Sequence, residues 1–108
     1  MTLSFQRAAR LSDVEAGLPL GVVLPDGTRV CLVRDGDRVY AVTDRCPHRE
    51  FALSGGDMVG PFILECPWHG ARFDVRTGRM IQGPATEDLA TYSVRLAGDE
   101  VFVGPRRP

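Results

Sequence analysis

The chain has 108 residues, enough for one domain, and its 44% hydrophobic and 25% charged residues are typical of a globular protein. The net charge of −1 argues against a nucleic-acid-binding protein, and the absence of lysine excludes a P-loop or Schiff-base lysine. No apolar run approaches the roughly 20 residues that span a bilayer, and residues 1–10 lack the apolar stretch of a signal peptide. We therefore expect a cytoplasmic protein whose three cysteines are free thiols or metal ligands.

The first part of the chain predicts a small antiparallel meander. A strand is expected at residues 4–8, followed by a helical turn in which Ser12 is the N-cap and Glu15 reaches back to it. Three β-rich runs and two tight glycine-containing turns follow, at residues 20–24, 28–34 and 38–43 and at residues 25–27 and 35–37. Consecutive strands joined by such turns pair as antiparallel neighbours.

The amino-acid composition changes at Asp44, after which the chain is rich in glycine and proline. Short strands and a turn are expected at residues 62–65, 71–74 and 76–79, and longer strands at 89–96 and 100–103, before a loose tail at 104–108. No segment sustains helical periodicity. The pattern predicts an all-β single domain, residues 1–108, with a loop-rich insertion at about residues 44–84.

Two short segments of this insertion contain both histidines and two of the three cysteines: Cys46-Pro47-His48 and Cys66-Pro67-Trp68-His69-Gly70. Two thiolates and two imidazoles suit either a mononuclear zinc site or a two-iron cluster with two cysteines on one iron and two histidines on the other. Zinc fingers usually place both cysteines first. Here each segment supplies one of each, as a cluster gripped between two loops requires.

The neighbouring residues also fit a cluster-binding loop. Gly70 permits close approach of the backbone, and Pro47 and Pro67 stiffen the two turns. By contrast, Cys31 lies in an apolar run with no metal-ligand spacing, and we expect a buried packing thiol.

Cys-x-His followed by Cys-Pro-x-His-Gly-x-x-Phe-(x)₃-Thr-Gly resembles the motif of Rieske 2Fe-2S proteins, and the surrounding strand layout resembles the whole Rieske domain. The resemblance implies three antiparallel sheets, with a cluster-binding subdomain inserted in a basal β scaffold. It implies that Cys46 and Cys66 bind the buried iron of one 2Fe-2S cluster, and that His48 and His69 bind the outer iron near solvent. Gly83-Pro84 resembles the family's third loop, which covers the cluster; a plain turn is the alternative.

The sequence departs from the respiratory branch of the family at four places. Phe51 and Trp68 stand where that branch has two disulfide-forming cysteines, and Ala71 and Phe73 stand where it has a serine and a tyrosine that donate hydrogen bonds to the cluster. Such donors stabilise the more negative reduced state. Without them we expect a potential at the bottom of the range of roughly −150 to +300 mV for such centres.

A low potential suits a one-electron carrier. The chain resembles the ferredoxin component of bacterial aromatic ring-hydroxylating dioxygenase systems, which implies electron transfer from an NAD(P)H-dependent flavoprotein reductase to a terminal oxygenase. No histidine is left for acid–base chemistry, so we expect no catalysis by the chain itself, and nothing demands more than a monomer. Candidate residues for docking and electron exit surround the expected tip: His48, Arg49, Glu50, Phe51, Trp68 and His69.

Plainer interpretations of that region stay open. Arg49, Glu50 and Phe51 are also compatible with ordinary solvated residues, and Trp68 with an aromatic lid packed on the neighbouring loop. Two other functions remain alternatives at this point: the small subunit of an assimilatory nitrite reductase, and a zinc-stabilised interaction module without redox function.

Overall fold

A computed structural model describes residues 4–47, 51–67, 70–83 and 87–107. Within these ranges the chain is nearly all strand, with two short 3₁₀ turns, η1 (Leu11–Asp13) and η2 (Leu53–Gly55). The strands are β1 (Gln6–Arg10), β2 (Leu20–Val23), β3 (Arg29–Asp35), β4 (Arg38–Thr43), β5 (Asp57–Met58), β6 (Ile63–Glu65), β7 (Arg72–Asp74), β8 (Met80–Gln82), β9 (Thr91–Ala97) and β10 (Glu100–Arg106). No helix in the described part of the chain is long and apolar enough to cross a membrane.

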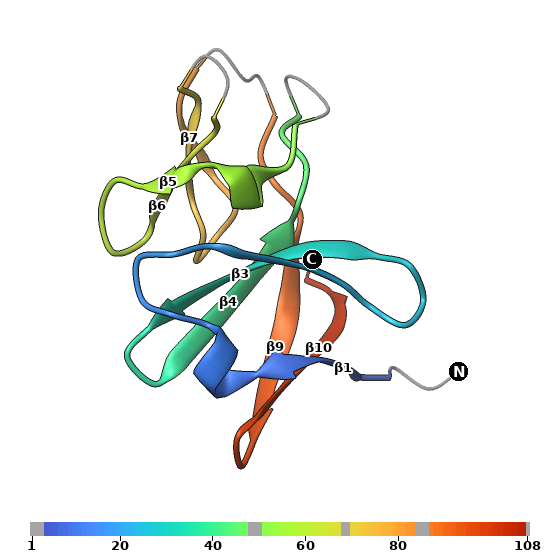
Figure 1. Ribbon diagram of the computed structural model, residues 1–108. Coiled ribbons are helices and arrows are strands. Elements are labelled where there is room, and N and C mark those ends of the chain that lie inside the picture. The colour runs from blue at the N-terminus through green and yellow to red at the C-terminus, as the bar shows by residue number, and fades with distance from the viewer. Residues whose placement is uncertain (1–3, 48–50, 68–69, 84–86, 108) are drawn as a thin grey trace.

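The basal part of the molecule is a sheet in the order β1-β10-β9-β4-β3-β2, which contains the predicted antiparallel meander (Figure 1). Its two halves are joined by the pairing of β4 with β9, in which Ala41 lies opposite Tyr92 and Val42 opposite Thr91. The all-β antiparallel fold is therefore confirmed. We expected three sheets. Among the described residues the hydrogen bonds form two, because the pairing of β4 with β9 joins the two basal halves into one sheet.

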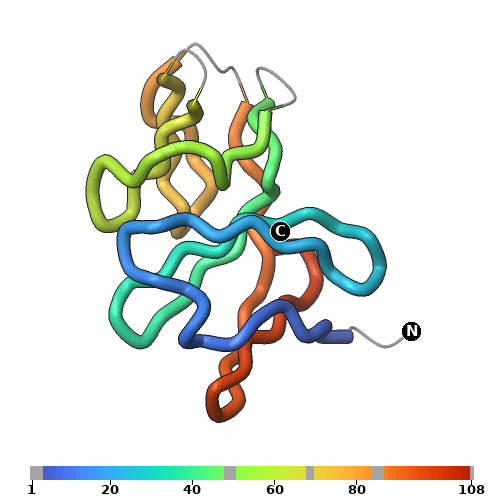
Figure 2. The backbone as a smooth tube through the Cα atoms, in the orientation of Figure 1, coloured from blue at the N-terminus to red at the C-terminus, as the bar shows by residue number. Residues whose placement is uncertain are grey.

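A second sheet, in the order β5-β6-β7-β8, forms the upper layer in the view of Figure 1, and the tube in Figure 2 shows the chain entering it after β4 and returning to the base through β9. All its pairings are antiparallel. Its strands have only two or three residues each. The segments after β4 and after β6 carry the two candidate ligand loops.

Two separate hydrophobic clusters stabilise the fold, and β3 contributes to both. Cys31 and Val33 belong to the cluster under the upper sheet, whereas Val30 and Leu32 belong to the basal cluster. This alternation follows from the two-residue period of side chains along a strand. We call these the upper core and the basal core.

Two local predictions were wrong. Ser12 does not cap a helix, because η1 begins at Leu11 with Arg10 in the cap position and no side-chain cap bond. The fully buried Val14 has extended backbone, which ends the turn before a helix can form. The tail is not loose either: β10 continues to Arg106, and a register shift between Val103 and Arg106 accommodates the proline between them.

Candidate metal centre

The first ligand loop follows β4 and begins with a buried cysteine. Cys46 is 1% exposed, and its backbone N–H donates to the carbonyl oxygen of Phe51 at 2.9 Å. Pro47 is half-buried beside it. The loop therefore turns back within a few residues and directs the Cys46 side chain inward, toward the upper core.

The second ligand loop repeats this arrangement after β6. Cys66 is 2% exposed, and its N–H donates to the carbonyl oxygen of Ala71 at 2.7 Å, again five residues along the chain. Gly70 has φ +72°, a left-handed conformation that side chains disfavour, so the turn requires glycine at this point. The exposed Pro67 stands at the outer side of the loop. Both loops are thus closed by the same backbone hydrogen bond.

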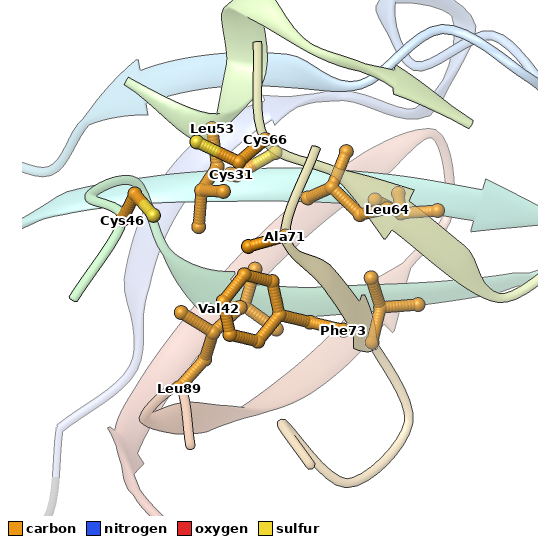
Figure 3. Packing of buried hydrophobic residues seen from close by; sticks show 11 residues of the cluster. Cys31, Val42, Cys46, Leu53, Leu64, Cys66, Ala71, Phe73 and Leu89 are labelled. Carbon is orange, nitrogen blue, oxygen red and sulfur yellow. The ribbon is translucent and has the colours of Figure 1, made fainter. Parts of the chain in front are cut away.

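The two cysteines lie in one buried cluster. Figure 3 shows Cys46 and Cys66 together with Cys31, Leu53 and Ala71 in the upper core. None of these three cysteines forms a disulfide within the part of the chain that the structure describes. Two buried cysteines that arrive from two loops of similar shape fit the sulfur side of a two-iron cluster, since thiolate is the ligand such clusters take. Among the described residues no group of three or more metal-binding side chains occurs.

Several predicted site residues lie outside the described part of the chain: His48, Arg49, Glu50, Trp68, His69 and Pro84. Phe51, proposed for docking, is described and is 40% exposed. Its carbonyl oxygen also closes the first ligand loop. The structure therefore brings together the two cysteine positions of the predicted ligand set, with Gly70 and both prolines in the loops that carry them.

Cys31 is buried, as predicted, and belongs to the same core. Burial raises the pKa of its thiol, and the negative charge of Asp44 raises it further. Since the nucleophile and metal ligand is the thiolate, this thiol is chemically inert in its present surroundings.

A brace across the second loop was missed in the sequence. Arg72 Nε donates to Glu65 Oε2 at 2.9 Å, and the two residues face each other across the β6–β7 pair. Gln82 Nε2, on β8, donates to the carbonyl oxygen of Gly70 at 3.3 Å. The opposite charges on either side of Cys66-Pro67-Trp68-His69-Gly70-Ala71 were a signal for the ion pair. The Gln82 bond has no local signal, because it depends on the register of a three-residue strand.

The walls of the upper core offer no hydroxyl at the two positions noted in the sequence. Ala71 and Phe73 are fully buried in the same cluster as Cys46 and Cys66. Their side chains contribute only carbon to the surroundings of the thiols.

The sequence model of the Rieske [2Fe-2S] domain family matches residues 4–93 of this chain. This chain belongs to the Rieske family. The ferredoxin component of the naphthalene 1,2-dioxygenase system of Pseudomonas putida is 35% identical over 103 residues, covering 95% of this chain and 97% of the relative. The ferredoxin of carbazole 1,9a-dioxygenase from Nocardioides aromaticivorans IC177 superposes with a TM-score of 0.88 at 38% identity, covering 94% of this chain and 98% of that one.

Two further Rieske structures bear on function. A ferredoxin solved in complex with the oxygenase of carbazole 1,9a-dioxygenase has a TM-score of 0.85 and 30% identity, over 95% of this chain and 94% of that one. A putative nitrite reductase small subunit from Mycobacterium tuberculosis has a TM-score of 0.83 but only 22% identity, over 97% of both chains. The second likeness shows the fold alone. Membership of the Rieske [2Fe-2S] family implies one such cluster, which the two buried cysteine loops fit.

Proposed function

We propose that this Rieske protein is the electron-transfer ferredoxin of an aromatic ring-hydroxylating dioxygenase system. The observation that carries the proposal is near full-length similarity to dioxygenase ferredoxins in a chain that keeps both cysteines buried in one core. When bound, the 2Fe-2S cluster accepts and donates one electron. The chain itself is a carrier and not the oxygenase.

The cluster ligands in this proposal are Cys46, Cys66, His48 and His69. Burial of both cysteines supports their place on the inner iron, away from water. The two loop closures, from Cys46 to Phe51 and from Cys66 to Ala71, hold each cysteine at the start of a turn that continues to its histidine in the sequence. The cluster subdomain in this assignment is about residues 44–84 of a single domain, which includes all four strands of the upper sheet.

The partners we propose are a terminal oxygenase and an NAD(P)H-dependent flavoprotein reductase. The relative solved in complex with an oxygenase supports the first. Both partners would dock at the same tip, around His48 and His69, because an electron leaves most readily where the cluster is nearest to solvent. The half-exposed Phe51 offers an aromatic contact there. The described cysteines form no disulfide, which suits a reducing compartment such as the cytoplasm, where we place the protein.

Electron transfer is tested by loading the cluster, reducing the protein and mixing it anaerobically with an oxidised ring-hydroxylating oxygenase. We expect a rhombic electron paramagnetic resonance signal that accounts for one electron per chain, and its decay as the oxygenase becomes reduced. A colourless protein that holds zinc would overturn the assignment of a 2Fe-2S cluster. A fully loaded protein that cannot reduce any such oxygenase would overturn the assignment to dioxygenase systems.

A further inference from the structure

Asp44 is a buried carboxylate that no step of the proposed electron transfer uses. It is 5% exposed and lies two residues before Cys46. Its Oδ1 accepts a hydrogen bond from the backbone N–H of Ser54 and its Oδ2 accepts one from the Ser54 hydroxyl, both at 2.7 Å. A buried charge is costly unless it is hydrogen-bonded in this way, so the pair is built to keep a carboxylate at this place.

The two residues stand at the two ends of the first ligand loop. Asp44 follows β4, and Ser54 lies in η2, so their bonds close the base of the loop, while the bond from Cys46 N–H to Phe51 closes it nearer its tip. Next to Ser54, Leu53 is fully buried in the upper core with both ligand cysteines. A loop closed twice holds its cysteine in one position.

The same pair also attaches the loop to the basal sheet. The backbone N–H of Asp44 donates to the carbonyl oxygen of Arg29 at 3.1 Å, at the start of β3. Gly21 of β2 packs so tightly against the pair that a Cβ there would lie 2.5 Å from the Ser54 hydroxyl oxygen and 2.6 Å from Asp44 Oδ2. This close approach leaves little space for water between the carboxylate and the sheet.

The field of Asp44 reaches the upper core. Burial raises the pKa of the Cys31 thiol and the negative charge of Asp44 raises it further, and Cys31 belongs to the same cluster as Cys46 and Cys66. A negative charge that is felt there opposes the arrival of an electron, because like charges repel more strongly where the dielectric is low.

We propose that Asp44, held by Ser54, is a positioning residue that fixes the first ligand loop to the basal sheet and, through its charge, lowers the reduction potential of the cluster. The inference rests on the proposed ligand set. It goes beyond electron transfer because it assigns control of the potential to a residue that does not bind iron.

Two variants separate the charge from the geometry. Asp44→Asn keeps an oxygen that can accept from the Ser54 N–H but removes the charge, so we expect a higher midpoint potential. Ser54→Ala keeps the charge but removes one of its hydrogen-bond donors, so we expect a lower midpoint potential. Asp57→Asn, at an exposed position on β5, is the matched control for loss of a surface charge and is expected to shift the potential least.

The midpoint is measured by protein-film voltammetry on iron-loaded protein, with iron content and the melting temperature recorded for each variant. Opposite shifts for Asp44→Asn and Ser54→Ala support the proposal. An unchanged potential in loaded Asp44→Asn, or shifts of the same sign in the two variants, would overturn it. If Asp44→Asn does not hold iron, the sign of the Ser54→Ala shift decides. Because voltammetry needs no partner protein, failure here is distinct from failure to reduce an oxygenase.

Discussion

Ala71 and Phe73 are fully buried in one cluster with the proposed ligand cysteines and bring no hydrogen-bond donor from their side chains. The contrast with a wall that carries hydroxyl groups is chemical and not one of shape, because serine and tyrosine differ from them by one oxygen atom. The potential of the cluster therefore depends on residues that do not contact iron.

Adding a hydroxyl at either position should raise the midpoint potential. A single hydrogen bond to the more negative reduced state is worth about 1 kcal/mol, which is about 40 mV for a one-electron couple. We expect Ala71→Ser and Phe73→Tyr each to shift the midpoint upward by that order in voltammetry. The unmodified protein should lie below about +100 mV, near the bottom of the range for such centres. A wild-type value above that limit would contradict the argument.

The three cysteines should respond differently to substitution. Cys46→Ala and Cys66→Ala each remove a proposed iron ligand, so the purified proteins should lose the reddish-brown absorption and the iron. Cys31→Ala is the matched control: it removes an equally buried thiol of the same core and should keep both. Visible absorption and iron analysis measure the outcome. Loss of the cluster in Cys31→Ala at normal stability would show that the ligand set has been assigned wrongly.

The turn between β7 and β8 connects the upper sheet to the base through a chain of side chains. Arg76 donates from Nη2 to Asp74 Oδ2 at 2.8 Å, and its guanidinium lies 4.1 Å from the ring centroid of Phe62. The Phe62 ring meets that of Tyr40, on β4, edge to face, with centroids 6.0 Å apart. The turn thus contributes to the attachment of the two layers as well as to the hairpin itself.

The ion pair of this turn makes stability depend on acidity. The hydrogen bonds from Arg76 hold the pKa of Asp74 below its ordinary value of 3.8, although partial burial opposes them. A lowered folded-state pKa contributes stability that is present above the ordinary value and is lost as the pH falls through the folded-state pKa. Arg76→Gln should therefore lower the free energy of unfolding at pH 7, and the difference from wild type should shrink well below pH 3.8.

Urea unfolding at several pH values measures this difference. Arg79→Gln is the matched control, because Arg79 is an exposed arginine of the same turn whose side chain forms no ion pair within the described ranges. Arg79→Gln should lower the free energy of unfolding only slightly at any pH. A difference between Arg76→Gln and wild type that stays constant with pH would assign the whole effect to the stacking on Phe62.

Strand-rich runs that lie between glycine turns could be predicted from the sequence, and β4 was placed at residues 38–43 as observed. The alternation of apolar residues and the turn chemistry are local, so they are visible without a structure. β5 and β8 were missed; they lie at the two edges of the upper sheet, and each is defined by its pairing with one neighbour, β6 or β7. The end of β10 was missed because Pro105 argues against a strand unless a register shift accommodates it.

The same distinction applies to the site. Cys46 and Cys66 could be proposed as ligands because ligand types and loop spacing are properties of the chain. Two hydrogen bonds could not be predicted: the bond from Ser54 to Asp44, 10 positions apart, and the bond from Gln82 to Gly70, 12 positions apart. In both, the approach of the two residues depends on tertiary packing. The sequence therefore suggests candidate ligands, whereas the contacts that hold the two cysteine loops in place become visible only in the structure.

At the scale of the whole molecule, the two cores are expected to differ in how much metal binding stabilises them. The upper core contains both proposed ligand cysteines, whereas the basal core is built on residues such as Val101 and Val103 of β10. Metal binding stabilises the elements that supply its ligands. The contribution of the cluster to stability should therefore fall mainly on one layer.

Removing iron by anaerobic chelation should loosen the upper layer first. In hydrogen–deuterium exchange, we expect the amides of Cys46, Cys66 and β7 to lose protection in the metal-free protein. The amides of Val101 and Val103, paired on both sides by β1 and β9, should keep theirs. An equal loss of protection in both layers would show that the cluster stabilises the fold as one unit.

A single tip for both partners predicts a shuttle. Excess oxidised oxygenase should slow reduction of the carrier by its reductase in stopped-flow measurements, because both compete for the surface around Phe51. A Phe51→Ala variant should weaken both complexes, whereas Val23→Ala, at an exposed apolar residue of the basal sheet, should weaken neither. Continued turnover with all three proteins cross-linked in one assembly would contradict a shared surface.

The two-sided character of β3 has a practical consequence for protein engineering. Val30 and Leu32 point away from the side on which Cys31 and Val33 contribute to the upper core. Repacking the basal face therefore offers a route to a more heat-resistant carrier whose redox behaviour is inherited unchanged. Substitutions on the opposite face offer the converse, a series of variants that differ in midpoint potential and share an unchanged basal core. The seven-residue strand β3 thus separates the two design problems.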